Sequence, residues 1–176
     1  MYSYKTMSSP IGKLTLVASN SALVALYVKN EEMPKKTGAF KDENHKVLKK
    51  TEKQLREYFE GLRREFNLPL DPEGTDFQAR VWGALTKIPY GKVWSYGEQA
   101  KFLKAPNAQR AVGGANGKNP IPIIIPCHRV IGSTGKLTGF AGGMEMKIFL
   151  LKLEGHEVDP HGLKLLLNNQ LGFLGL

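Results

Sequence analysis

The single cysteine of the chain, Cys127, lies in the segment whose residue types could support nucleophilic chemistry. His128 and Arg129 follow it, and the densest apolar run of the chain, residues 120–126, precedes it. A cysteine attacks as its thiolate, so a histidine, a cation or a helix N-terminus must lower its ordinary pKa of about 8.5. His128 and Arg129 are the candidates for this role. The alternative is a small buried hydrophobe followed by two surface residues.

The residues before Cys127 predict how its side chain is held. Residues 121–125 are rich in isoleucine, which is typical of a buried strand, but prolines in and beside the run exclude a fully paired central strand. We therefore expect a short, irregular strand at a sheet edge, with Cys127 placed just after it by Pro126. Neighbouring side chains of an extended chain point to opposite faces. Either the backbone turns at Cys127, or a water molecule carries a proton between Cys127 and His128.

Composition sets limits on the class of protein. The 25 basic and 16 acidic residues give a net charge of +9 and a pI near 9.6, which suits a polyanionic partner without identifying it. One cysteine excludes an intramolecular disulfide, and four scattered histidines form no Cys-rich zinc cluster, so we expect no metal and no cofactor. The sequence shows no signal peptide and no apolar run of membrane-spanning length. We expect a cytoplasmic protein with no membrane partner.

The first part of the chain predicts a small antiparallel meander followed by one helix. Turn signals separate three expected strands at residues 2–7, 13–18 and 23–28. Residues 31–44 are polar and predict a surface loop. The helix after them ends at Gly61, and its apolar face consists of Val47, Leu48, Thr51, Leu55, Tyr58 and Phe59. Residues 62–74 are either a last strand or a linker, and we place a domain boundary near residue 70, which gives domains 1–70 and 71–176.

The second part of the chain predicts a series of short helices. The first begins at Thr75 or Asp76 and ends before residues 89–91, with an apolar stripe formed by Phe77, Val81, Ala84, Leu85 and Ile88. Ser95 and Glu98 match a capping box, which predicts a helix to about residue 103. After a turn at residues 104–106, Asn107 is the expected cap of another helix. Two short helices joined by a tight turn indicate a helix-turn-helix, although this signal alone is weak.

The second helix of this pair has two unlike faces. Its expected core face is formed by Ala108, Ala111, Val112 and Ala115. The face roughly opposite carries Arg110, Gly113, Gly114 and Gly117. Glycine costs a helix about 1 kcal/mol relative to alanine. A glycine-rich helix face is therefore expected where a flat partner has to approach the helix backbone closely. The alternative is that the glycines allow helix–helix contact or fray the end of the helix.

A glycine-rich loop and a last helix follow the cysteine segment. The loop, residues 132–143, is either a passive connection or the wall of a pocket for a planar base. The helix is expected to run to Leu153, with its apolar residues in the core. Glu154 then stands at the helix C-terminus, where the macrodipole disfavours a carboxylate unless a cation or histidine is near. Glu154 is therefore a candidate partner of His128, or else a solvated surface residue. The tail to Leu176 is apolar enough to dock on the body.

These motifs resemble the O6-alkylguanine-DNA alkyltransferases. The motifs are Pro-Cys-His-Arg-Val at 126–130, Arg-Ala-Val-Gly-Gly-Ala at 110–115, Asn-Pro at 119–120, Pro-Tyr-Gly-Lys-Val at 89–93, Ser-Tyr at 95–96 and Gly-Phe-Ala-Gly-Gly at 139–143. The resemblance is strong from about Thr75 to Gly155. It implies an α/β (α+β) fold, with a ribonuclease H-like antiparallel-sheet domain that supports a mostly helical domain. The second domain is expected to carry the helix-turn-helix and a short active-site strand.

The resemblance also implies an activity: irreversible, stoichiometric transfer of the alkyl group of O6-alkylguanine, and of O4-alkylthymine, from double-stranded DNA to Cys127 after base flipping. His128, oriented by Glu154, takes the thiol proton through a water molecule, and Tyr96 donates a proton toward guanine N3. The expected DNA contacts are Ser95, Arg110, Ala111, Gly113, Gly114 and Arg129, with Arg110 filling the gap that the flipped nucleotide leaves. The expected structural and pocket residues are Asn119, Val130, Phe140, Ala141 and Gly142. The resemblance implies a monomer without metal.

The sequence departs from some family members, which carry zinc ligands near the N-terminus and a tyrosine and serine at the positions of Phe140 and Ala141. Loss of that hydroxyl leaves the preference among alkyl groups open. Two other classes of protein also fit parts of the sequence. A binding-only protein would flip alkylguanine and recruit other factors, but its nucleophile would be replaced. A basic helix-turn-helix regulator would use Cys127 structurally, but the glycine-rich face offers few side chains to read base edges.

Overall fold

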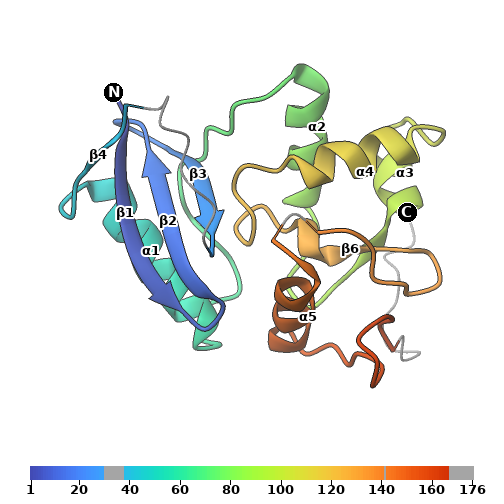
Figure 1. Ribbon diagram of the computed structural model, residues 1–176. Helices are drawn as coiled ribbons and strands as arrows, with labels where there is room; N and C mark the ends of the chain where they lie inside the picture. The colour runs from blue at the N-terminus through green and yellow to red at the C-terminus, as the bar shows by residue number, and fades with distance from the viewer. Residues whose placement is uncertain (30–37, 141, 167–176) are drawn as a thin grey trace. The chain divides into compact units, whose positions relative to one another are not determined.

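The computed structural model describes residues 1–29, 38–140 and 142–166. The chain forms two compact units, Met1–Glu73 and Gly74–Leu176 (Figure 1). Across the described ranges, no helix has the length and apolar character needed to cross a membrane.

The first unit is built on a four-stranded sheet. Its strands are β1 (Ser3–Ser9), β2 (Gly12–Ala18), β3 (Leu23–Val28) and β4 (Phe40–Lys41). β2 pairs antiparallel with β1 and with β3, which confirms the predicted meander, whereas β4 pairs parallel with β1 at the sheet edge. The sequence missed β4 because bonds to residues far away in the chain, from Phe40 N to Tyr2 O (3.2 Å) and from Asp42 N to Tyr4 O (3.0 Å), recruit it. The rest of that predicted loop includes residues 30–37, which lie outside the described residues.

One helix, α1 (Lys46–Phe59), packs against β1, β2 and β3. Its buried face consists of Val47, Leu48, Thr51, Gln54, Leu55 and Tyr58, so five of the six predicted positions are buried and Phe59 is only half-buried. Gly61 follows in the left-handed region (φ 74°), which ends the helix as predicted. Residues 62–73 form no strand beyond one bridge between Leu23 and Leu70, so the predicted alternative of a last strand is wrong.

Three helices of the second unit pack on one another: α2 (Asp76–Leu85), α3 (Tyr96–Phe102) and α4 (Gln109–Gly117). A capping box opens α3 at Ser95, with Glu98, as the sequence predicts. Thr75, one of the two predicted N-caps, opens α2 and forms a second capping box with Gln78. The predicted cap of α4 is wrong. Ala108 is the N-cap and makes no side-chain bond, because a turn from Ala105 O to Ala108 N (2.9 Å) extends the connection past Asn107.

Polar contacts between these helices determine which face of α4 is buried. The amides of Gln99 and Asn116 exchange two hydrogen bonds of 3.0 and 2.7 Å, and the Trp82 indole donates to Ala115 O at 2.9 Å. The buried residues of α4 are Val112, Ala115 and Asn116. Ala111 is exposed, so its predicted place in the core is wrong. The Gln99–Asn116 pair turns the helix so that Asn116 occupies the interior.

A parallel strand pair and the last helix complete the second unit. β5 (Trp94–Ser95) pairs with β6 (Val130–Ile131), and α5 (Met144–Leu153) packs against the turn before β6. The core beside them consists of Val93, Ile131, Leu137, Leu151 and Leu165. Leu165 shows that the described part of the tail docks on this unit, and residues 167–176 lie outside the described residues.

Candidate active site

The segment before Cys127 is a buried turn, which corrects the predicted strand at residues 121–125. Ile125 N donates to Ile121 O at 2.9 Å, and Ile123 has a φ of 75°, in the left-handed region that β-branched residues rarely adopt. The Asn119 side chain holds the turn, since it accepts from Ile121 N (3.0 Å) and donates to Ile125 O (2.8 Å). The isoleucines are apolar because the turn is buried. Apolar character alone does not distinguish such a turn from a strand.

Cys127 begins a single 3₁₀ turn, Cys127–Arg129, and strand β6 starts only after it. Cys127 N donates to Ile125 O (2.9 Å) and Arg129 N donates to Pro126 O (3.0 Å). Of the two arrangements considered for this segment, the backbone turn is therefore present. Both the Cys127 and the His128 side chains are buried.

The Cys127 thiol is held by one polar side chain. Asn119 Nδ2 lies 3.2 Å from Sγ and donates to it. Burial raises the pKa of Cys127 to about 11, although the Asn119 hydrogen bond and the charge of Lys147 act in the opposite direction. The resting group is therefore a protonated thiol at neutral pH. Reaction at Sγ needs a base that removes this proton.

His128 has the features of that base. Its Nε2 lies 2.9 Å from Glu154 Oε1, while its buried Nδ1 has no hydrogen-bond partner among the described residues. Burial lowers the pKa of His128, so the imidazole is neutral at pH 7. The carboxylate of Glu154 can only accept, which places the proton of the neutral ring on Nε2 and a lone pair on Nδ1. Nδ1 can accept a proton directly or through a water molecule.

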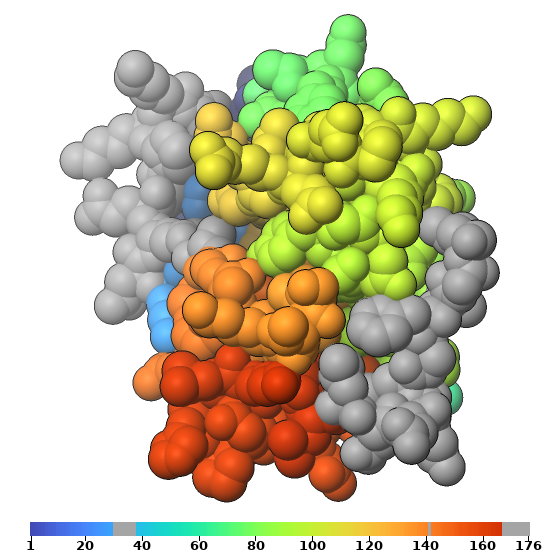
Figure 2. All heavy atoms as spheres, turned by 90° about the vertical axis from the view of Figure 1, so that its right-hand side faces the viewer, coloured from blue at the N-terminus to red at the C-terminus, as the bar shows by residue number. Residues whose placement is uncertain are grey.

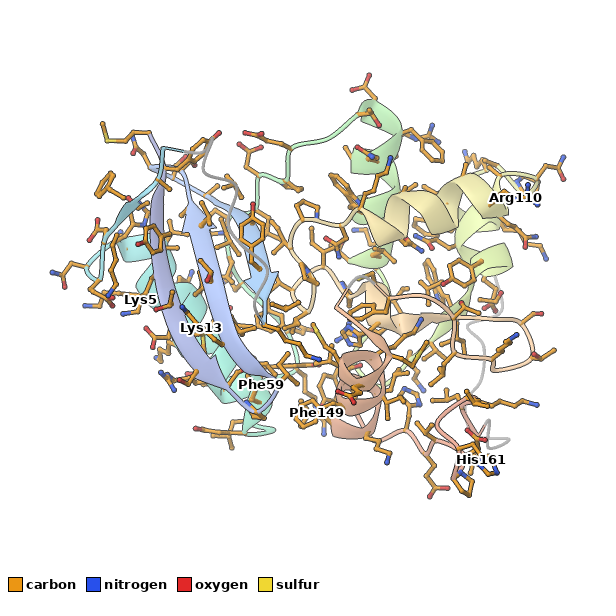
Figure 3. All side chains as sticks on the ribbon, in the orientation of Figure 1. Lys5, Lys13, Phe59, Arg110, Phe149 and His161 are labelled. Atoms are coloured by element: carbon orange, nitrogen blue, oxygen red, sulfur yellow. The ribbon has the colours of Figure 1, made fainter. Side chains whose placement is uncertain are left out.

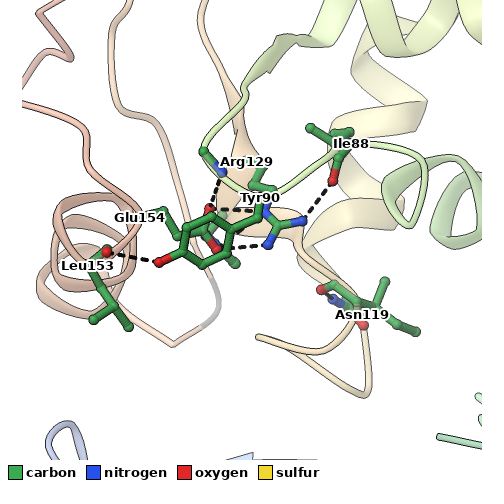
Figure 4. Close-up of polar contacts among 9 residues, drawn as sticks. Ile88, Tyr90, Asn119, Arg129, Leu153 and Glu154 are labelled. Atoms are coloured by element: carbon green, nitrogen blue, oxygen red, sulfur yellow. Dashed lines mark hydrogen bonds and ion pairs between the residues drawn. The ribbon is translucent and has the colours of Figure 1, made fainter. Parts of the chain in front are cut away.

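Glu154 is buried, as expected for a partner of His128 and not for a solvated residue. Arg129 contacts its carboxylate through Nε (2.9 Å to Oε2) and Nη2 (2.8 Å to Oε1) (Figure 4). Burial opposes ionisation, yet His128 and Arg129 together hold the pKa of Glu154 well below its usual range. Arg129 is itself only 6% exposed. The structure therefore does not place Arg129 at a DNA-facing surface, in contrast to the sequence-based expectation.

Lys147 is a site residue that the sequence interpretation missed. Its side chain is buried, and Nζ donates to Val130 O (2.7 Å) and Thr138 O (3.1 Å). Burial lowers the pKa of Lys147 to about 8, and its charge favours the Cys127 thiolate. The sequence offered one signal for it, a lysine within the apolar run of α5. A lysine that is buried there needs polar partners for its charge.

Lys147→Met should make the Cys127 thiol less acidic, because the substitution keeps an unbranched side chain and removes the charge. A rise of about one pKa unit would slow thiolate-dependent alkylation by about tenfold at fixed pH. The measurement is the pH dependence of Cys127 alkylation by a small thiol reagent. Lys152→Met, at an exposed position of the same helix, is the matched control. An unchanged thiol pKa in Lys147→Met contradicts this role.

The other predicted residues divide between an outer face and the neighbourhood of the loop. Arg110, Ala111 and Gly114 are exposed on α4, and Arg110 points away from the core (Figure 3). Gly113 faces the Tyr96 ring, since a Cβ there would lie 3.5 Å from it. In the space-filling view, α3 and α4 lie together on one face of the second unit (Figure 2). Ser95 uses its hydroxyl as the α3 cap.

Around the glycine-rich loop, the Tyr96 hydroxyl lies 3.0 Å from Thr138 Oγ1. Val130 is fully buried and Phe140 is partly buried. A Cβ at Gly142 would collide with the Met146 side chain and approach the Phe140 ring to 3.0 Å, so a larger residue here would have to displace Met146. Ala141 lies outside the described residues. No group of three metal-binding side chains occurs among the residues that the structure describes.

Comparison with known proteins extends over both units. The model of the 6-O-methylguanine DNA methyltransferase DNA binding domain matches residues 76–156, and that of the ribonuclease-like domain matches residues 2–72. The chain belongs to the 6-O-methylguanine DNA methyltransferase family. The resemblance found in the motifs is therefore confirmed. The match also includes the first unit, whose sequence resembles the family only in general character.

Individual members of this methyltransferase family are similar over most of the chain. A methylated-DNA–protein-cysteine methyltransferase of Mycobacterium tuberculosis is 50% identical over 155 residues, 88% of this chain and 93% of its own length. One of Methanosarcina acetivorans is 46% identical and covers 86% of this chain and 97% of its own length. The crystal structure of the M. tuberculosis O6-methylguanine methyltransferase, at 50% identity, covers 88% of this chain and 93% of its own with a TM-score of 0.81. A structure of the M. tuberculosis protein in complex with DNA has a TM-score of 0.79 at 51% identity, covering 86% of this chain and 91% of its own.

Proposed function

We propose that this methyltransferase repairs DNA by transferring the alkyl group of O6-alkylguanine irreversibly to Cys127. The observation that carries the proposal is a buried, protonated thiol beside a neutral histidine whose Nε2 faces an ionised carboxylate at 2.9 Å. The names of the relatives and the DNA complex of the M. tuberculosis protein support the substrate class. O4-alkylthymine is a second proposed substrate, because it presents an alkylated oxygen at a similar position on the base.

The first step requires the alkylated base to leave the stack, which costs a few kcal/mol. We assign this step to the exposed face of α4, which enters the minor groove. Arg110 fills the gap in the base stack, while Ala111 and Gly114 let the helix backbone approach the DNA closely and Gly113 lets α4 lie against the Tyr96 ring. Larger side chains on this face would hold the DNA away from the helix backbone.

In the chemical step, Nδ1 of His128 takes the thiol proton through a water molecule, while Glu154 holds the Nε2 proton. Sγ of Cys127 attacks the alkyl carbon, the bond from that carbon to O6 breaks, and its electron pair passes to the guanine ring. Tyr96 donates a proton at guanine N3. The arrangement is a Cys–His–Glu form of general triad logic.

The product at Cys127 is a thioether. A cysteine hydrolase forms a thioester that water can open, but a thioether offers no such route, so each molecule acts once. Nucleophile, base and carboxylate all come from one chain, which supports action as a monomer, and we assign a supporting role to the first unit. The binding-only alternative does not use the thiol that is present. The regulator alternative leaves the His128–Glu154 pair without a role.

The direct test is peptide mapping after reaction with O6-methylguanine duplex. One methyl group should appear on the peptide that contains Cys127, and the damaged base should return to guanine. Unmodified guanine duplex is the control. Restored guanine without modification of Cys127 would rule out this acceptor, and stable binding without methyl transfer would favour the binding-only alternative.

Arg110→Ala should slow repair of saturating duplex substantially, by up to the few kcal/mol needed to unstack a base. Reaction with the free base O6-benzylguanine, which needs no flipping, should stay near the parental rate. The measurement is the single-turnover rate with each substrate. A purely phosphate-binding arginine would instead weaken binding uniformly and lower the salt slope by about one, with little effect at saturation.

Lys118→Ala is the matched control for Arg110, because Lys118 is an exposed cation at the end of the same helix. Its loss should affect salt-dependent affinity only. Equal losses of Arg110→Ala on duplex and free base would mean that the substitution damages the fold or the thiol, and the assignment of Arg110 to the base stack would fall.

A further inference from the structure

The Arg129 guanidinium is an interior group whose contacts converge on one carboxylate. Nε lies 2.9 Å from Glu154 Oε2 and 3.3 Å from Oε1, Nη2 lies 2.8 Å from Oε1, and Nη1 donates to Ile88 O at 2.7 Å. Its central carbon lies 5.8 Å from the centroid of the Tyr90 ring, whose hydroxyl donates to Leu153 O at 3.1 Å (Figure 4). The two-pronged contact with Glu154, the hydrogen bond to Ile88 O and the Tyr90 ring together fix the position of the guanidinium.

Each oxygen of Glu154 consequently receives N–H donors. Oε1 faces Arg129 Nη2 and His128 Nε2, and Oε2 faces Arg129 Nε and the Gly91 amide at 3.4 Å. A carboxylate surrounded in this way remains ionised and cannot donate to the imidazole. The neutral ring must then carry its proton on Nε2.

We propose that Arg129 is a positioning residue for alkyl transfer: it orients the Glu154 carboxylate and balances its charge, so that His128 keeps a free lone pair on Nδ1. The inference rests on the proposed function, in which His128 is the base. Without the arginine, the buried carboxylate would lie against His128 and lose the two-pronged cation that balances its charge. The imidazole would then bind a second proton and could not accept the thiol proton.

The charges around His128 set the direction of this effect. Burial is the largest influence on the pKa of His128 and lowers it, Glu154 raises this pKa, and Arg129 and Lys147 lower it. His156, which follows α5, is buried, and its own pKa is lowered by burial, raised by Glu154 and lowered by His128. α2 also packs against the turn, and its charged residues Asp76 and Arg80 are exposed. Removal of the Arg129 charge takes away one of the influences that lower the pKa of His128 while Glu154 still raises it, so this pKa should rise.

The test is the pH dependence of reaction with O6-benzylguanine, which removes DNA contacts from the measurement. Arg129→Met should lower the rate at neutral pH by about tenfold or more, and the acid limb of its pH–rate profile should move upward by about one unit or more. Arg129→Lys keeps the positive charge but not the two-pronged contact with Glu154. The acid limb of the pH–rate profile of this variant should therefore stay at the parental pH. Arg80→Met is the matched control, since Arg80 also donates to a backbone carbonyl, Leu103 O, in the same unit.

A double variant and a spectrum separate positioning from folding. In Arg129→Met/Glu154→Gln no carboxylate faces His128, so the upward shift of the acid limb should disappear even though the rate stays low. Nitrogen NMR of His128 in the protein alone should show the Nε2–H tautomer in the parent and imidazolium in Arg129→Met at neutral pH. A parental pH profile or a neutral imidazole in folded Arg129→Met overturns the proposal. Failure of Cys127 to become alkylated in the parent instead overturns the proposed function.

Discussion

Cys127→Ser should abolish alkyl transfer and leave DNA binding intact. A serine hydroxyl is far less acidic than a thiol and a weaker nucleophile toward an alkyl carbon, so the neutral His128 cannot activate it enough for measurable reaction. The substitution removes no charge and lies in the interior, away from the exposed face of α4. The measurement combines a repair assay with DNA affinity determined at fixed salt.

The parental protein provides the second half of this prediction. With excess O6-methylguanine duplex, guanine should form up to one equivalent of protein and then stop, because the thioether at Cys127 has no route back to the thiol. Intact mass should show complete conversion to the singly methylated chain. Product beyond one equivalent would disprove single turnover, and residual transfer by Cys127→Ser would place the acceptor elsewhere.

Glu154→Gln should slow transfer by about 10²- to 10⁴-fold, the usual effect of losing a positioned proton acceptor. An amide in place of the carboxylate no longer stabilises the imidazolium that forms when His128 takes the thiol proton. Binding to saturating DNA should be unchanged, since Glu154 is buried at the end of α5 and not on the face of α4. The measurement is the single-turnover rate between about pH 6 and 9.

Stability has to be measured in the same variant. Glu154 is also the partner of buried Arg129, and breaking a buried ion pair typically costs about 3–5 kcal/mol. Glu157→Gln, an exposed glutamate three residues further on, is the matched control and should change neither rate nor melting temperature. If folded Glu154→Gln transfers at the parental rate across the pH range, Glu154 does not support the base, and the role of His128 has to be tested again.

Local signals in the sequence determined much of the fold. Strand alternation and turn residues located β1, β2 and β3, and a capping box located the start of α3 at Ser95. Cap residues placed the start of α2 at Thr75 or Asp76, of which Thr75 is the N-cap. These features depend on interactions within a few residues, which a sequence displays directly. The position of Glu154 at a helix end was also visible, because a carboxylate there is unfavourable without a partner.

The errors arose where distant residues decide the structure. The isoleucines before Cys127 form a turn because the Asn119 side chain satisfies its backbone, and the core face of α4 includes Asn116 because Gln99 pairs with it. Neither partner can be identified from apolar periodicity. The cap at Asn107 failed for a similar reason, because the length of the preceding turn depends on how α3 and α4 pack.

The sequence by itself determined the family and the residue types of the chemistry: a lone cysteine, the histidine after it and a carboxylate at a helix end. Only the tertiary structure decided how these groups are charged. Burial keeps Cys127 a thiol and His128 neutral, while Arg129 points inward to Glu154 and Lys147 lies in the interior. Charge states depend on desolvation and on contacts between segments far apart in the chain, and a linear sequence specifies neither until it is folded.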